Sequence, residues 1–71
     1  NRMPTDVVLR FTTHYEPSLR AQAAVALGLQ GNTLSLGPLA LLIGDDDPLV
    51  QVAAAGAALR IDGTATTATA D

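Results

Sequence analysis

The sequence has 71 residues, enough for one small domain, and 48% of them are apolar although only 3% are aromatic. Apolar content that comes mostly from Ala and Leu favours packed helices over a β-sandwich, which would need more Val, Ile and aromatic side chains. Four basic residues stand against seven acidic ones, and the net charge of −3 disfavours binding to nucleic acid or to an anionic membrane surface.

The first predicted element is a helix from Thr5 to about Thr13, after a polar lead-in over residues 1–4. Pro4, which ends the lead-in, suits the first turn of a helix. The apolar residues between positions 7 and 11 fit a short helix, but the same run also has β propensity, so a strand is the competing prediction. The internal repeat described below favours the helix.

A second helix is predicted from Ser18 to Leu29. Pro17 fits its first position, after a turn over residues 14–17. Its apolar residues follow a spacing of about 3.6 residues. Gln30 and the two residues after it form a stop signal, because Gly31 can adopt a positive φ angle.

The third predicted helix runs from about Leu34 to Ile43, and Asn32 or Thr33 can cap its start. The sequence Gly37-Pro38 lies inside this range. Because Pro lacks a backbone N–H, this dipeptide either delays the helix start to Pro38 or leaves a one-turn preamble before it.

The last helix is predicted from Pro48 to about Ile61, with Asp62-Gly63 closing it. Asp47, the end of an acidic triplet, is expected to cap this helix and face its positive end. Residues 64–71 contain mainly Thr and Ala and offer no core-forming side chain, so we expect them to be a flexible tail.

No apolar run approaches the roughly 20 residues that a membrane-spanning helix needs. No signal peptide is recognisable either. We therefore expect no membrane insertion and a cytoplasmic location.

The two halves of the chain match without a gap when one is shifted by 31 residues, so that Glu16-Pro17 overlies Asp47-Pro48. Two helix–turn–helix units are therefore predicted, because a fixed period of 20–50 residues is typical of a solenoid. The matched apolar positions are Val8 and Leu39, Leu9 and Ala40, Phe11 and Leu42, Leu19 and Val50, Ala23 and Ala54, Ala24 and Ala55, and Ala26 and Ala57.

The segment from Asp47 to Ile61 resembles the second helix of a short HEAT-like repeat, the type first described in phycobilisome lyases and common in bacterial scaffold proteins. The segment from Glu16 to Gly28 matches the same pattern, including its Ala-Leu-Gly ending. The resemblance implies an all-α fold, an α-solenoid fragment of two HEAT-like helical hairpins with four helices. Repeat 1 would cover residues 5–32 and repeat 2 residues 33–63. For function, the resemblance implies a binding surface.

The second repeat carries apolar residues at outer positions where this family usually has charged ones. These positions are Leu34, Leu41, Leu49, Val52, Gly56 and Leu59. The last four share one stripe of the final helix, opposite its inward face. A helix that is apolar on every side is normally buried on every side. We therefore expect this surface, with Arg60, Gln51 and the acidic turn at its rim, to bind a protein partner or a second copy of the chain.

No residue pattern predicts catalysis, and we expect neither a cofactor nor a metal. The acidic triplet lacks the spaced oxygens and the distal Glu of a calcium loop. His14 is the only histidine and Cys is absent, so the ligands of a zinc site are missing. Arg10, Arg20 and Arg60 can bind an acidic group, but solvation or pairing within the chain is the expected outcome.

The sequence thus predicts a non-enzymatic protein–protein interaction or structural subunit. One alternative, implied by the lyase-type resemblance, is an accessory protein linked to tetrapyrrole chromophore attachment. Another is that the chain is a fragment of a longer HEAT scaffold, in which its apolar faces would meet further repeats.

Overall fold

The computed structural model describes the backbone of residues 4–70 and the side chains of residues 4–63. Its elements are α1 (Thr5–Phe11), α2 (Pro17–Gln30), the short 3-10 turn η1 (Thr33–Ser35), α3 (Leu36–Ile43) and α4 (Pro48–Ala70). The described backbone contains no strand, so the all-α prediction with four helices is confirmed. The competing strand over the first apolar run is excluded, because α1 occupies it.

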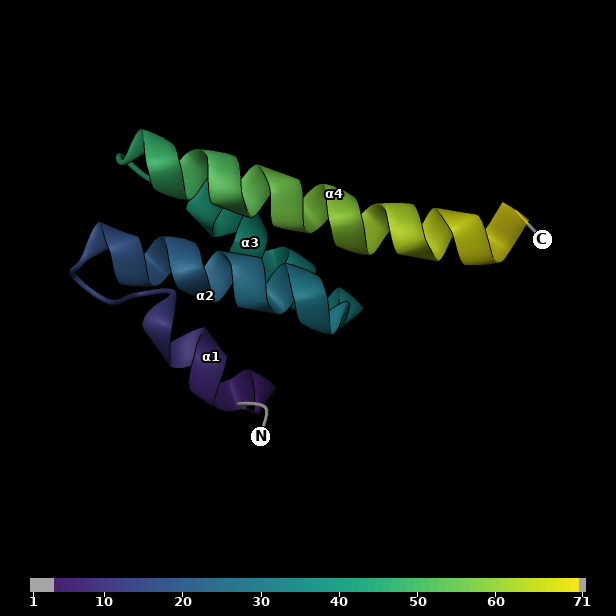
Figure 1. Ribbon diagram of the computed structural model, residues 1–71, viewed down its shortest axis with the longest axis horizontal. Helices are drawn as coiled ribbons and strands as arrows, with labels where there is room; N and C mark the ends of the chain where they lie inside the picture. The colour runs from purple at the N-terminus through teal and green to yellow at the C-terminus, as the bar shows by residue number, and fades with distance from the viewer. Residues whose placement is uncertain (1–3, 71) are drawn as a thin grey trace.

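Helices α2 and α4 lie side by side and run in the same direction (Figure 1). Helix α1 packs on α2 at the side away from α4, and α3 lies behind α2 and α4 in this view. We call α1 with α2 the first helical pair, and α3 with α4 the second. The most extensive packing between the pairs is that of α2 on α4.

The helix ends follow the local signals of the sequence. Gly31 adopts a left-handed φ of 71° and donates its N–H to the carbonyl of Leu27 at 3.2 Å, which ends α2. The side chain of Asn32 accepts the N–H of Leu34 at 2.9 Å and caps η1. Asp47 Oδ1 likewise accepts the N–H of Leu49 at 2.9 Å, so the predicted cap of α4 is confirmed.

The Gly37-Pro38 dipeptide lies in the first turn of α3. Helix η1 forms the one-turn preamble, and α3 begins at Leu36, two residues before the proline. A proline in the first turn removes an N–H that has no helical partner there, so the helix can start ahead of it.

The predicted end of α4 near Ile61 is wrong, because the helix continues to Ala70. Residues 64–70 are therefore its last turns, and Asp71 lies outside the described residues. Glycine ends a helix when it adopts a positive φ, as Gly31 does, and Gly63 stays within the helix. No proline follows, and the three Ala residues after Gly63 favour helix.

The core lies between the two helical pairs and consists largely of small side chains. A methyl group at Gly28 would lie 2.8 Å from Cβ of Ala57, so the backbone of α2 touches α4 directly. Gly28 is thus a close-packing point. The buried apolar residues are Val8, Ala21, Ala23, Ala24, Leu27, Leu39, Leu42, Val50, Ala54, Ala57 and Ile61.

Candidate interaction surface

Helix α4 is apolar on two opposite sides, of which only one is covered. Its inner side is buried, as Val50 and Ala54 show with no exposed area. The outer stripe, which we define as Leu49, Val52, Gly56 and Leu59, faces away from the core. Leu49 is 62% exposed, and Val52 and Leu59 are each 71% exposed. The large apolar residues of this stripe are therefore left unburied within the described structure.

The other predicted site residues are also exposed, but the structure does not gather them all in one hollow. Leu34 is 84% exposed and Leu41 is 81% exposed, and Arg60 is exposed on α4. Leu41 lines a hollow together with Leu9 of α1 and the residues that follow this helix, whereas Leu59 lines a different hollow between α3 and α4. The predicted surface is therefore at least two apolar areas.

The hollow at Leu59, which we call the α3/α4 groove, has a volume of about 530 Å³. Among the described residues that line it, only Asp62 is charged. The sequence-based prediction named Leu59 alone from this lining. The lining residues are Leu36, Ala40, Ile43, Ala55, Ala58, Leu59 and Asp62.

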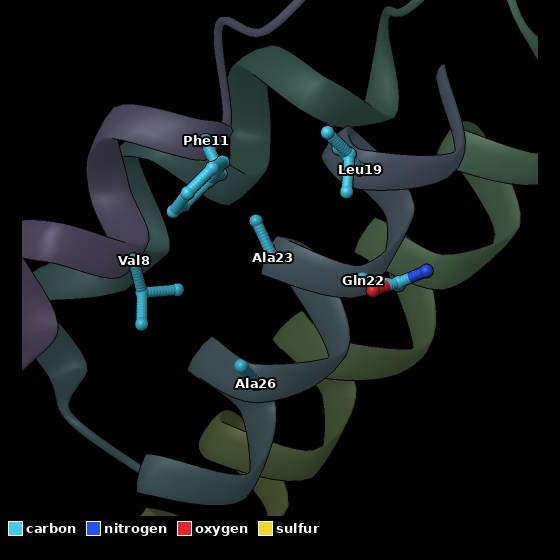
Figure 2. Close-up of a pocket in the computed structure, with 6 residues that line it drawn as sticks. All are labelled: Val8, Phe11, Leu19, Gln22, Ala23 and Ala26. Carbon is cyan, nitrogen blue, oxygen red and sulfur yellow. The ribbon is translucent and has the colours of Figure 1, made fainter. Parts of the chain in front are cut away.

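A second apolar hollow, the α1/α2 groove, lies on the first helical pair and has a volume of about 260 Å³. Phe11 and Val8 from α1 face Ala23 of α2 across it (Figure 2). Leu19, Gln22 and Ala26 of α2 complete its lining. None of its residues was predicted as a site from the sequence. Each of them does lie 31 positions before a matched residue of the second repeat.

Arg20 ties the turns before α2 and α4 together. Its Nε and Nη2 donate to Oδ2 and Oδ1 of Asp45 at 2.8 and 3.0 Å. Its Nη1 donates to the carbonyls of His14 and Tyr15 at 2.7 and 3.0 Å. Arg20 is therefore paired within the chain, as expected, and the two charged side chains are only 14% and 11% exposed.

This ion pair shifts both titrations. The hydrogen bond from the Arg20 guanidinium, followed by the one from the Asp47 N–H, holds the pKa of Asp45 below its usual range. The hydrogen bond to Asp45 in turn raises the pKa of Arg20. The fold therefore favours the ionised form of both groups.

Gln51 occupies the position in the second pair that Arg20 has in the first. Its Nε2 donates to the carbonyl of Asp45, just as Arg20 donates to the carbonyl of His14. Asp45 and His14 are themselves 31 residues apart. Gln51, predicted as a rim residue, thus turns back onto its own turn in the chain described here.

The polar residues of the first turn also form local contacts. His14 Nδ1 accepts the N–H of Glu16 at 3.0 Å, and its ring stacks on Tyr15 with centroids 4.6 Å apart. Ser18 Oγ donates to Glu16 at 2.6 Å. Within the described residues, no group of three or more His, Cys, Asp or Glu side chains is placed to hold a metal ion.

No helix in the described part of the chain combines the length and the apolar character needed to cross a membrane. Comparison of the sequence and the fold with models of protein families, with characterised proteins and with solved structures finds no match.

Proposed function

We propose that this chain is a non-enzymatic protein–protein interaction or structural subunit, built as two HEAT-like repeats, that binds its partner through the outer face of the second helical pair. The observation that carries the proposal is the exposure of Val52 and Leu59, at 71% each, on a helix whose opposite side is buried. Large apolar side chains in a row on one helix face are typical of a surface that becomes covered.

The energetics favour a binding role for this face. Burial of one Val or Leu side chain contributes about 2 kcal/mol. Leu49, Val52 and Leu59 together can therefore supply several kcal/mol of association free energy, before the cost of ordering the partners is subtracted. We expect Leu59 and Val52 to contribute most and Arg60 to act at the rim.

The chemistry of the polar residues also supports binding over catalysis. The hydrogen bonds of the polar side chains hold the turns between the helices. This holds for Arg20, Asp45, Asp47 and His14. The two grooves that flank α2 and α4 are lined mainly by Ala, Leu and other aliphatic side chains. Such surfaces provide contact area and shape, which is what association requires.

The test is the composition of the native complex, measured by mass, for the wild type and for Leu59→Glu. We expect Leu59→Glu to lose the partner while its helical circular dichroism signal is kept. Leu29→Glu is the matched control, because Leu29 is 65% exposed on α2, outside the outer stripe. It should retain the partner. Equal retention by both variants would contradict the proposal.

A further inference from the structure

The α1/α2 groove corresponds, residue by residue, to the covered face of the second helical pair. Each of its lining residues has a counterpart 31 positions later, and these counterparts lie in or against the core between the pairs. Five of the six are buried, and Ala53 is partly buried against the core. The counterparts are Leu39, Leu42, Val50, Ala53, Ala54 and Ala57.

The α3/α4 groove shows the reverse correspondence. Most of its lining residues have counterparts 31 positions earlier on the face of the first pair that the second pair covers. The exceptions are the counterpart of Asp62, Gly31, which is exposed, and that of Leu36, Thr5, which is partly exposed. Ala24 and Leu27 have no exposed area, Thr12 is 9% exposed, and Gly28 is buried against α4. Within the chain, one face of the first pair packs against one face of the second pair. The α3/α4 groove is equivalent to the first of these faces and the α1/α2 groove to the second, and neither groove is covered.

We infer that the occupant of the α3/α4 groove is the α1/α2 groove of a second copy of this chain, docked head to tail. This inference rests on the proposed function and names its partner. The docked copies would pair α4 of one copy with α2 of the next, as α2 pairs with α4 within each chain, but at a wider spacing, because Leu59 stands where Gly28 does. Val52 and Leu59 of one copy would enter the groove lined by Phe11, Leu19 and Ala26 of the next.

The sizes of the side chains determine the helix spacing in this arrangement. Within the chain, Gly28 lies directly against Ala57, and no space remains there for a methyl group. In the contact between two copies, Leu59 of one copy occupies the position that Gly28 has within the chain. Ala26 of the other copy occupies the position of Ala57. A Leu side chain does not fit at the distance that separates Gly28 from Ala57, so α4 of one copy and α2 of the next must lie further apart, with Leu59 filling part of the α1/α2 groove of about 260 Å³.

The polar groups at the junction are also compatible. In the contact between two copies, Gln51 of one copy occupies the position that Arg20 has within the chain, and His14 of the other copy occupies the position of Asp45. His14 Nδ1 accepts a backbone N–H, so its neutral ring carries the proton on Nε2. That Nε2–H can donate to Oε1 of Gln51. The docked interface therefore replaces an ion pair by two neutral groups, and neither position leaves an unpaired charge in the junction.

A head-to-tail contact uses a different surface on each copy, so it propagates instead of closing at two chains. The mass measured by sedimentation velocity should therefore rise past the dimer as concentration increases. A symmetric contact of α4 with α4 would stop at the dimer. The two alternatives are distinguished by variants that block one groove at a time.

Leu59→Glu blocks the α3/α4 groove and Ala26→Glu blocks the α1/α2 groove. Each should weaken self-association of the isolated full chain by at least about 100-fold, because a carboxylate would have to be buried in an apolar contact. An equimolar mixture should form a 1:1 dimer that grows no further, because each variant keeps one intact groove. If Ala26→Glu fails to fold by circular dichroism, Gln22→Glu, at an exposed position of the same groove, replaces it.

Three outcomes would overturn the inference. One is a wild-type chain that stays monomeric at high micromolar concentration. Another is that Ala26→Glu self-associates normally while Leu59→Glu does not, which would indicate a symmetric dimer. The third is a native complex that depends on Leu59 but contains a different polypeptide or a further helical repeat. This last result would leave the proposed function intact, so the two failures are distinguishable.

Discussion

The two helical pairs differ most at one helix face, which is covered in the first pair and open in the second. On α2 this face consists of small residues, Ala21, Ala24 and Gly28, all of them buried. The positions 31 residues later on α4 are Val52, Ala55 and Leu59, and both Val52 and Leu59 are 71% exposed. The face that already carries a helix is therefore made of small residues, and the open face of larger ones.

This difference shows what a repeat can reveal beyond secondary structure. Matched positions share a place in the helix, so a change in side-chain size between them changes how closely a neighbouring helix can pack there. Gly28 is required by a helix at contact distance, and its counterpart Leu59 has room around it.

The largest difference in stability is expected when a leucine is changed to alanine in each pair, at Leu27 in the first and at Leu59 in the second. Leu27 has no exposed area, so Leu27→Ala should lower the free energy of unfolding by about 2–5 kcal/mol through the cavity that it leaves. Leu59→Ala should change the stability of the dilute chain by less than about 0.5 kcal/mol. Urea denaturation followed by circular dichroism measures both. Comparable losses in the two variants would show that the outer stripe already belongs to the core of the single chain.

A smaller effect should come from adding a methyl group to each pair. Gly28→Ala should lower the free energy of unfolding by about 1–3 kcal/mol, because Ala57 blocks the new methyl. Gly56→Ala meets nothing within 4 Å and should raise the free energy of unfolding by about 0.5–1 kcal/mol through higher helix propensity. Thermal melts of the two variants check the opposite signs. A stabilising Gly28→Ala would mean that α2 and α4 are not in direct contact.

The smallest effect concerns the ion pair that joins the two turns. Because the pKa of Asp45 is lowered in the folded state, the pair stabilises the fold above the usual aspartate pKa, and this contribution is lost as the pH falls through the lowered folded-state value. We expect the wild type to lose stability below about pH 4, and Asp45→Asn to lose less over the same range. Urea denaturation at neutral and acid pH measures the difference.

Asp46→Asn is the control for this experiment. Asp46 Oδ1 also lies 3.8 Å from Arg20 Nη2, but the Asp46 side chain is 98% exposed, so solvent screens this contact. Its pH dependence should follow that of the wild type. If Asp45→Asn and Asp46→Asn behaved alike, the pairing of Arg20 with Asp45 would not contribute to the acid sensitivity of the fold.

Local signals in the sequence predicted the elements that depend on neighbouring residues. The cap at Asp47 and the stop at Gly31 are each determined within one turn of helix. The all-α fold follows from the same signals. The end of α4 was mispredicted because Gly63 is compatible with a helix as well as with its end.

Contacts between distant parts of the chain were not predictable in the same way. Arg20 and Asp45 are 25 residues apart, and their meeting depends on how the two pairs are stacked. The α1/α2 groove and the contributions of Leu36 and Ile43 to the α3/α4 groove likewise require the packed helices. The internal offset of 31 residues contained part of this information, because it links each groove residue to a counterpart in the core.

Thiol labelling can show whether the outer stripe is covered when the chain is assembled. The sequence has no Cys, so Leu59→Cys and Leu29→Cys each introduce a single thiol at a similarly exposed position of α4 and α2. The rate of maleimide labelling then reports the accessibility of each position. We predict that position 59 labels several-fold more slowly than position 29 in the assembled protein, and at a similar rate after dilution to the single chain. Equal labelling at every concentration would contradict the account.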